Sequence, residues 1–207
     1  MNEEKGIFIV FEGLDGAGTT TQMKILGDIF SSKGKKVFLT HEPTDNPIGK
    51  VVRACLQKKF TTTASSLALL YSSDRDDHLY NPEYGIEKKL SEGFVVISDR
   101  YFYSSLAYQA VECPYDFIEN INSRFRDADI IIFIDTPVDE CMERIEKRGE
   151  EKELFEKKEY LMKVRENYLR SFSSLTGGVR LITVDGTLSI DGITERIKEE
   201  LSSLSLL

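Results

Sequence analysis

The residues best suited to chemistry lie in a glycine-rich stretch from Gly13 to Thr21. Its spacing fits the pattern G-x-x-x-x-G-K-[ST], in which backbone N–H groups surround a phosphate. Gly18 and Thr20 occupy the expected positions of this pattern, whereas Thr19 stands in place of its lysine. The stretch therefore predicts a phosphate-binding loop that lacks the usual cation.

The sequence on either side of this loop provides the context that such a site requires. Residues 6–12 are apolar enough for a buried strand, and residues 22–30 carry apolar side chains at helical spacing. A strand, a loop and a helix N-terminus together direct backbone N–H groups at an anion. We expect the hydroxyl of Thr20 to bind Mg²⁺, as the last residue of the motif does. The alternative is a tight turn without a ligand.

A second candidate site follows the apolar residues 94–97, where Asp99 and Arg100 stand next in the chain. An arginine fork at the end of a strand suits bidentate binding of a second phosphate. Asp99 would stay ionised near Mg²⁺ or its waters. The alternative is a helix cap beside a surface ion pair.

Two further stretches have both a functional and a purely structural interpretation. Tyr71 is either a core residue or a platform on which a base stacks. The basic residues between 144 and 158 form either a solvated helix face or a lid that brings cations over the transferred phosphate. His41 and His78 have no partner pattern, and we assign neither a catalytic role.

Short apolar stretches alternate with segments of helical periodicity along the chain. The expected strands are residues 6–12, 37–40, 94–97, 129–135 and 179–184. The expected helices are residues 22–30, 48–56, 84–92, 101–111, 115–125, 137–148, 160–172 and 190–201. A further helix is expected to be capped by residues 61–63 and to reach at least residue 78. This alternation predicts a three-layer α/β fold with a parallel sheet, formed by a single domain over residues 1–207. Ligands would bind at the carboxyl ends of the strands, where the unusual residues lie.

The composition limits the classes of function and the compartment. With 41% hydrophobic and 30% charged residues, the chain has the composition of a soluble globular protein. The net charge of −8 argues against nucleic acid as the main ligand, because such proteins usually present a basic face. We see no targeting signal and no apolar run of about 20 residues, and the three widely spaced cysteines suit reduced thiols. We therefore expect a cytoplasmic protein with no membrane or nucleic-acid partner.

Four parts of the chain together resemble thymidylate kinase, a family of P-loop nucleoside-monophosphate kinases. They are FEGLDGAG at residues 11–18, Glu42-Pro43 with Ile48-Gly49-Lys50 and Arg53, DRYFYSSLAYQ at residues 99–109, and Phe155-Glu156-Lys157-Lys158. The match follows essentially the whole chain in order, and residues 99–109 are its most specific part. The resemblance implies the three-layer P-loop kinase fold, with a five-stranded parallel sheet and helices on both faces. It also implies Mg²⁺-dependent transfer of a phosphoryl group from ATP to dTMP, giving ADP and dTDP for dTTP biosynthesis.

The resemblance further implies roles for residues at matching positions. Asp15 would lie near the sugar 3′-hydroxyl of dTMP. Arg53 and Arg100 would bind its phosphate. Tyr71 would stack on thymine, and Arg75 would hydrogen-bond a carbonyl group of the base.

Other positions complete the implied site. Tyr108 would crowd the place of a ribose 2′-hydroxyl, Gln109 would lie at the base edge, and Arg148 would lie against adenine. The implied substrate-binding residues are Asp15, Glu42, Pro43, Arg53, Tyr71, Arg75, Arg100, Ser104, Tyr108 and Gln109. The implied ATP-binding residues are Gly13, Leu14, Asp15, Gly16, Ala17, Gly18, Thr19, Thr20, Arg144 and Arg148. The implied catalytic residues are Asp15, Asp99, Arg100 and Arg148, with Mg²⁺ held by Thr20 and Asp99.

The chain departs from the family pattern at three positions. Gly16 provides no basic group inside the loop, and Thr19 replaces the lysine. His41 stands where many relatives have arginine. The missing charge would then come from a lid cation or from the helix after residue 47: Arg144, Arg148, Lys152 or Lys50.

Two alternatives to an active thymidylate kinase stay open. Because of Thr19, the chain is either an enzyme or a nucleotide-binding protein with weak or lost transferase activity. The acceptor is either dTMP or another pyrimidine deoxynucleotide such as dUMP. The resemblance also implies a homodimer, for which the apolar helix faces between Ile48 and Leu70 would supply the contact.

Overall fold

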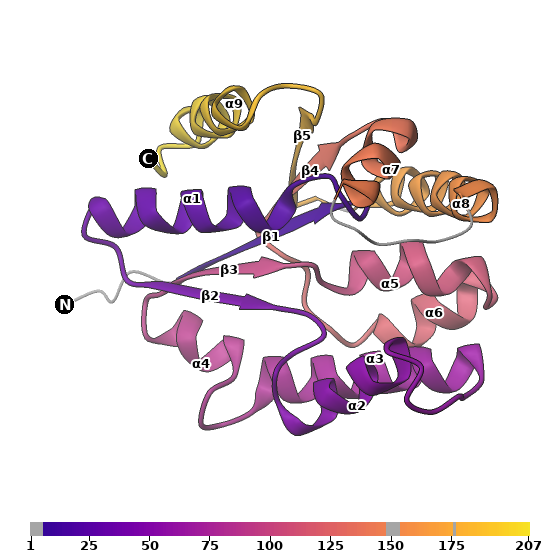
Figure 1. Ribbon diagram of the computed structural model, residues 1–207. Helices are drawn as coiled ribbons and strands as arrows, with labels where there is room; N and C mark the ends of the chain where they lie inside the picture. The colour runs from indigo at the N-terminus through magenta and orange to yellow at the C-terminus, as the bar shows by residue number, and fades with distance from the viewer. Residues whose placement is uncertain (1–5, 148–153, 176) are drawn as a thin grey trace.

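Five parallel strands form one sheet in the computed structural model, which describes residues 6–147, 154–175 and 177–207 (Figure 1). The strands are β1 (Ile7–Gly13), β2 (Val37–His41), β3 (Val95–Asp99), β4 (Ile130–Asp135) and β5 (Arg180–Asp185). Their order across the sheet is β2-β3-β1-β4-β5. The central strands β1 and β4 read as continuous runs of Ile, Val and Phe because they are buried on both faces. This architecture confirms the predicted α/β fold with a five-stranded parallel sheet.

Helices cover the sheet on both faces and extend past its carboxyl edge. The described helices are α1 (Thr19–Ser32), α2 (Pro47–Leu56), α3 (Ala64–Tyr80), α4 (Ile86–Ser91), α5 (Phe102–Tyr108), the 3₁₀ helix η1 (Gln109–Val111), α6 (Tyr115–Asn122), α7 (Val138–Glu146), α8 (Leu154–Ser173) and α9 (Ile190–Ser203). In Figure 1, α1 and α9 lie above the sheet, α2 to α6 lie below it, and α7 and α8 stand at the end to which the strands point. Among the described residues, no helix combines the length and the apolar character that crossing a bilayer requires.

Several helix boundaries differ from the sequence-based expectation. The helix expected over residues 101–111 divides after Tyr108 into α5 and η1. Helix α7 ends at Glu146, before residue 148, and α8 begins at Leu154, inside the charge-rich segment expected to precede a helix at residue 160. Glu and Lys are good helix formers. The charge run therefore lengthens the helix.

Strand β3 continues to Asp99, beyond the apolar residues 94–97 that we expected to form it. The extension is paired on both sides, because Asp99 is in register with Phe11 of β1 and with His41 of β2. Parallel pairing brings the carboxyl ends of neighbouring strands to the same edge of the sheet. The glycine loop, the segment after β2 and the segment after β3 consequently meet there, as the sequence predicts.

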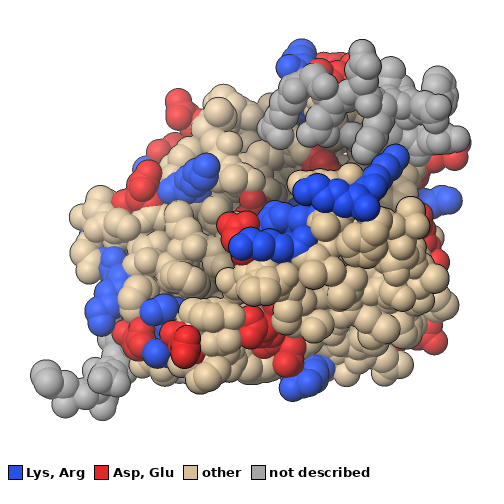
Figure 2. Space-filling model, turned by 60° about the horizontal axis from the view of Figure 1, so that its bottom comes forward, with Lys and Arg blue, Asp and Glu red and all other residues tan. Residues whose placement is uncertain are grey.

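The surface carries its charge unevenly, although the net charge of the chain is −8. Figure 2 shows one face, on which several basic side chains gather near the middle and acidic side chains lie in several separate places. Broad areas of the same face are drawn with neither kind of charged side chain. On this face, the largest group of basic side chains thus lies near the middle.

Candidate active site

The loop between β1 and α1 has a backbone conformation that its glycines permit. Gly16 (φ +89°) and Gly18 (φ +100°) lie in the left-handed region, which other residues rarely adopt. Gly18 is the N-cap of α1, so no side chain caps this helix, and its first turn contains no acidic residue. The N–H groups at this helix end are therefore available to an anion.

Helix α7 supports the glycine loop from its carbonyl side. A Cβ atom at Gly16 would lie 2.8 Å from the carbonyl oxygen of Cys141, so a side chain here would push the helix away. Arg144 donates to the carbonyl oxygens of Gly16 and Ala17, both at 3.4 Å, and to that of Gly186 at 2.9 Å. The guanidinium of Arg144 thus fixes carbonyl groups of the loop, whereas the backbone N–H groups of the loop would bind a phosphate.

Thr20 and Asp99 provide oxygen atoms that fit a divalent cation. The hydroxyl of Thr20 donates to Asp99 Oδ2, while Asp99 Oδ1 is buried without a hydrogen-bond partner among the described residues. A buried carboxylate oxygen without a partner is unusual, and Mg²⁺ prefers such hard oxygen ligands. Within the described ranges, no group of three or more His, Cys, Asp or Glu side chains could hold a metal ion. A Mg²⁺ ion here would take its remaining ligands from water and phosphate.

The guanidinium of Arg100 is surrounded by oxygen atoms of four side chains. It donates to Asp15 Oδ1 at 2.7 Å, to Ser104 Oγ at 3.0 Å, and to the hydroxyls of Tyr168 and Tyr108 at 3.1 and 3.4 Å. Burial disfavours its charge, but the surrounding oxygen atoms outweigh this effect and raise the pKa of Arg100 above its ordinary value. Arg100 is therefore a fixed cation at the carboxyl edge of the sheet.

A buried carboxyl group lies next to this arginine. Glu12 is fully buried and accepts hydrogen bonds from the backbone N–H of Tyr101 at 2.8 Å and from the hydroxyls of Ser104 and Tyr168 at 2.6 and 2.8 Å. Burial raises the pKa of Glu12 to about 7, against the opposing effect of the positive charge of Arg100. The sequence analysis did not single out Glu12, because an acidic residue at the end of a strand carries no specific signal by itself.

These side chains border a cavity of about 320 Å³, which is large enough for a small ligand. Nine of the ten residues predicted to bind the substrate line it: Asp15, Glu42, Pro43, Tyr71, Arg75, Arg100, Ser104, Tyr108 and Gln109. The sequence analysis did not predict the other lining residues: Leu56, Ala64, Leu67, Tyr101, Ser105, Glu112 and Tyr160. Apolar positions such as Leu67 look the same in sequence whether they line a cavity or pack in a core.

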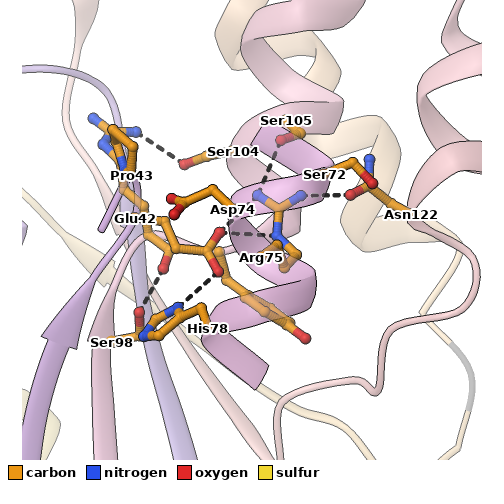
Figure 3. A network of polar contacts seen from close by, with 12 residues as sticks. Glu42, Pro43, Ser72, Asp74, Arg75, His78, Ser98, Ser104, Ser105 and Asn122 are labelled. Atoms are coloured by element: carbon orange, nitrogen blue, oxygen red, sulfur yellow. Dashed lines mark hydrogen bonds and ion pairs between the residues drawn. The ribbon is translucent and has the colours of Figure 1, made fainter. Parts of the chain in front are cut away.

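Arg75 lines this cavity and belongs to a network of buried polar groups, shown in Figure 3. Its side chain is only 1% exposed and forms an ion pair with Glu42 at 2.7 Å. It also donates to Asn122 and to Ser105. Glu42 accepts a further bond from His78 Nδ1 at 3.1 Å. Burial opposes the charge of Glu42, but the Arg75 guanidinium outweighs burial and lowers the pKa of this carboxyl group.

The sequence analysis missed two members of this network, His78 and Asn122. Arg75 and His78 are three positions apart on α3, so helical spacing places both on one face, and Glu42 lies between them in Figure 3. That spacing is a signal that could have been used. Asn122 comes from the end of α6, and nothing local in the sequence indicates its contact with Arg75.

Arg53 is the one predicted substrate residue that does not line the cavity. Its Nη2 atom donates to the carbonyl oxygen of Pro43, which does line it, and to Asp45 at 2.9 Å. The Nε–H of Arg53 is buried without a partner among the described residues. His41, which stands where many relatives have arginine, lies with its Nδ1 atom 2.9 Å from the carbonyl oxygen of Pro43.

Part of the predicted lid lies outside the described residues. Arg148 and Lys152 belong to this part, so the structure does not place them. Three other cations of the segment have described ion pairs, all with acidic residues of α7. Arg144 pairs with Glu140 at 2.7 Å, Lys147 with Glu143 at 3.8 Å, and Lys158 with Asp139 at 2.5 Å.

Comparisons with known proteins agree on one family. A family model described as "Thymidylate kinase" matches residues 11–197. The chain is 36% identical over 197 residues to a putative thymidylate kinase of Treponema pallidum, covering 94% of each chain. It is 43% identical over 172 residues to a probable thymidylate kinase of Pyrococcus horikoshii, covering 80% of this chain and 82% of the relative. It is 42% identical over 173 residues to a probable thymidylate kinase of Thermococcus kodakarensis, covering 79% and 83%.

Proposed function

The chain belongs to the thymidylate kinase family, and from this premise we propose that its site transfers the γ-phosphoryl group of ATP to dTMP, giving ADP and dTDP. The observation that carries the proposal is the arrangement at the carboxyl edge of the sheet. A cavity lined by Arg100 and Arg75 opens beside a glycine loop that ends in an uncapped helix N-terminus. The loop suits the donor phosphates, and the cavity suits a nucleoside monophosphate.

On the donor side, the loop residues Gly13 to Thr20 would bind the ATP phosphates through backbone N–H groups. Thr20 and Asp99 would hold Mg²⁺, which when bound neutralises charge on the donor phosphates. Arg144 would maintain the shape of the loop from the carbonyl side, as its contacts indicate. We retain the proposal that Arg148 lies against adenine.

On the acceptor side, Arg100 would bind the dTMP phosphate and Asp15 would meet the sugar 3′-hydroxyl. Arg53 would contribute to phosphate binding once its buried Nε–H finds an acceptor. Tyr108 lies where its hydroxyl meets both the Arg100 guanidinium and the backbone N–H of Asp15. It would therefore limit the space near the sugar and disfavour a 2′-hydroxyl.

The base would bind at the far end of the cavity. Burial raises the pKa of Tyr71 to about 12, so this residue presents a neutral ring for stacking. Arg75 would donate to a carbonyl oxygen of the pyrimidine, with Gln109 at the base edge. Glu42 would hold Arg75 in place, whereas Pro43 and Ser104 would hold the phosphate-binding residues Arg53 and Arg100.

The transfer itself needs no general base. The acceptor is a phosphate oxygen that is already anionic near neutral pH, because the second pKa of a phosphate monoester is about 6. Catalysis therefore reduces to in-line positioning and to neutralising charge on the transferred group. Arg100, the loop N–H groups and the metal site formed by Thr20 and Asp99 provide these functions.

A coupled assay with ATP and Mg²⁺ tests this function directly. The purified protein is offered dTMP, dUMP, UMP and AMP in parallel, and ADP formation is followed. We expect the highest kcat/KM with dTMP, with dUMP reduced by about tenfold to 200-fold for the missing methyl group. Equal or greater turnover of another monophosphate would reassign the acceptor. Binding of dTMP without turnover would identify a nucleotide-binding protein that has lost transfer because of Thr19.

We further propose the setting in which this activity occurs. The described chain would act as a single domain in the cytoplasm, supplying dTDP for dTTP biosynthesis. Residues 144–158 would act as a lid over the donor nucleotide. Two copies would form a homodimer through α2 and α3. Exposed apolar residues of this region are Val51 on α2, Leu69 on α3 and Phe60 between the two helices.

A further inference from the structure

Two hydroxyl groups connect Arg100 to the buried carboxylate of Glu12. The hydroxyls of Ser104 and Tyr168 both donate to Glu12 Oε2, at 2.6 and 2.8 Å. Arg100 Nη1 donates to the same two hydroxyl oxygens, at 3.0 and 3.1 Å. The carboxylate belongs to β1 and the hydroxyls to α5 and α8, so three elements meet around one side of the guanidinium.

The carboxylate determines which way the two hydroxyls point. A hydroxyl has a single proton to donate. Since Ser104 and Tyr168 give theirs to Glu12, their oxygen atoms are left to accept from Arg100. Without an acceptor at Glu12, either hydroxyl can turn its proton toward the guanidinium, which would repel it.

The backbone of Arg100 is held in one unusual conformation. Its φ of +72° lies in the left-handed region, which a residue with a side chain rarely adopts. The hydroxyl of Ser98 donates to the carbonyl oxygen of Arg100 at 2.7 Å, and the N–H of Arg100 donates to Phe11 at 2.9 Å. Hydrogen bonds to β3 and β1 therefore fix the backbone of Arg100, independently of the contacts that its side chain makes.

The other side of the guanidinium has a more exposed partner. Nη2 pairs with Asp15, whose side chain is 56% exposed. An incoming phosphate carries more negative charge than a carboxylate and would compete with Asp15 for Nη2. The neutral hydroxyls at Nη1 do not repel a phosphate, so they can keep their bonds when it binds.

We propose that Glu12, acting through Tyr168 and Ser104, is a positioning residue that directs Arg100 at the phosphate of a nucleoside monophosphate. This inference rests on the proposed function, in which Arg100 binds that phosphate. The hydroxyl oxygen of Tyr168 also lies 3.3 Å from the carbonyl oxygen of Gly13. The same side chain therefore lies beside both the acceptor arginine and the first residue of the donor loop.

Calorimetry with dTMP and with thymidine separates positioning from general structural support. Tyr168→Phe removes one acceptor of Arg100 and keeps the aromatic packing against Phe133 and Phe172. We expect Kd for dTMP to rise about tenfold, the effect of one lost hydrogen bond to a charged group, while Kd for thymidine stays unchanged. At pH 8, above the pKa of about 7 at which Glu12 becomes a carboxylate, Glu12→Gln should act in the same direction, because its amide donates where the carboxylate accepts. Tyr103→Phe is the matched control, since its buried hydroxyl donates to Asp127 instead.

A double-mutant cycle then tests whether Tyr168 acts through Arg100. In an Arg100→Lys background, Tyr168→Phe should change the dTMP affinity by less than twofold, because the group that it positions is gone. An undiminished tenfold effect in that background would overturn the proposal. A parallel loss of thymidine affinity in the single variant, or an unchanged dTMP affinity, would overturn it as well.

Two controls keep this test independent of folding and of the function itself. The midpoint temperatures of thermal unfolding of Tyr168→Phe and Tyr103→Phe should agree within a few degrees. If Glu12→Gln does not fold, Tyr168→Phe alone tests the proposal. The proposed function fails separately, when the natural protein does not turn over dTMP in the coupled assay. The affinity ratio of dTMP to thymidine still decides the positioning role in a protein that binds dTMP without turnover.

Discussion

At the scale of single residues, Thr19 is the position with the largest expected effect on rate. A lysine here would place a cation at the β- and γ-phosphates, and one charge-assisted contact contributes about 1.5–3 kcal/mol. Arg144 touches the loop but is bound to carbonyl groups of Gly16 and Ala17, and Arg100 is paired with Asp15. We therefore expect Thr19→Lys to raise kcat with dTMP by about 10- to 100-fold in the coupled assay.

The control for this substitution is Thr21→Lys, which adds the same charge at an exposed position of α1. It should leave kcat within about twofold of the natural protein, because the added charge stays in solvent. If Thr19→Lys has no effect either, another cation already supplies the charge. In that case Arg148 or Lys152 would be the next residue to replace.

A second prediction at this scale concerns Glu12 and the pH dependence of the free energy of unfolding. Its pKa is raised from 4.5 to about 7 in the folded protein. Between these values the folded chain keeps a proton that the unfolded chain releases, so stability falls as pH rises, by up to about 1.4 kcal/mol per pH unit. Urea unfolding at pH 5, 6 and 7 should show a smaller decline for Glu12→Gln than for the natural protein. The exposed Glu195→Gln should follow the natural protein, and three parallel slopes would contradict the prediction.

Most of the residues around the cavity could be predicted because the family motifs name them directly. Gln109 belongs to the motif at residues 99–109, whereas Tyr71 and Arg75 were assigned from matching positions of the family. The roles of Glu12 and Asn122 could not be predicted in the same way, because they depend on contacts between distant segments, whereas the spacing of His78 from Arg75 was a usable signal. Tyr168 donates to Glu12 across 156 positions of the chain, which no local pattern reveals.

At the scale of elements, the contact between the glycine loop and α7 would shape the proposed donor site. Gly16→Ala would force a side chain into the left-handed region, which costs about 1–2 kcal/mol, and would bring Cβ to 2.8 Å from Cys141 O. Helix α7 must then move, and Arg144 with it. We expect KM for ATP to rise at least tenfold, measured at saturating dTMP.

Gly34→Ala provides the matched control for this change. Gly34 has φ +77° at the end of α1, and a Cβ there would meet no atom within 4 Å. The variant should lose a similar amount of unfolding free energy in urea but keep the KM for ATP. A comparable rise in KM for both variants would show that backbone strain, and not the contact with α7, causes the effect.

The elements themselves were predictable where periodicity is strong. All five strands lie where the apolar runs predict them, because buried parallel strands need such runs on both faces. The boundaries of elements were not predictable where they depend on charged residues or on contacts with other strands. β3 extends to Asp99 because β1 and β2 pair with it, and α8 starts early because Glu and Lys favour helix.

At the scale of the whole molecule, an acidic protein has to bind two anionic nucleotides. The net charge of −8 repels them at long range, so binding depends on cations placed at the carboxyl edge. Arg100 and Arg75 lie there with acidic partners, Asp15 and Glu42. Each pair keeps its arginine in position in the free protein, and the exposed pair at Asp15 can open when a phosphate arrives.

The last prediction concerns the homodimer that we propose. α2 and α3 pack together on the lower side of Figure 1, and Leu69 on α3 is 50% exposed. A contact through this surface would bury Leu69, and a glutamate there would be an unpaired charge in an apolar interface. We expect the natural protein to sediment at about twice its chain mass of 23.6 kDa and Leu69→Glu to sediment as a monomer. Leu188→Glu, at a similarly exposed leucine before α9, should stay dimeric. A natural protein that sediments at its single-chain mass at all concentrations would contradict the proposal, and a dimer that survives Leu69→Glu would move the interface to another face.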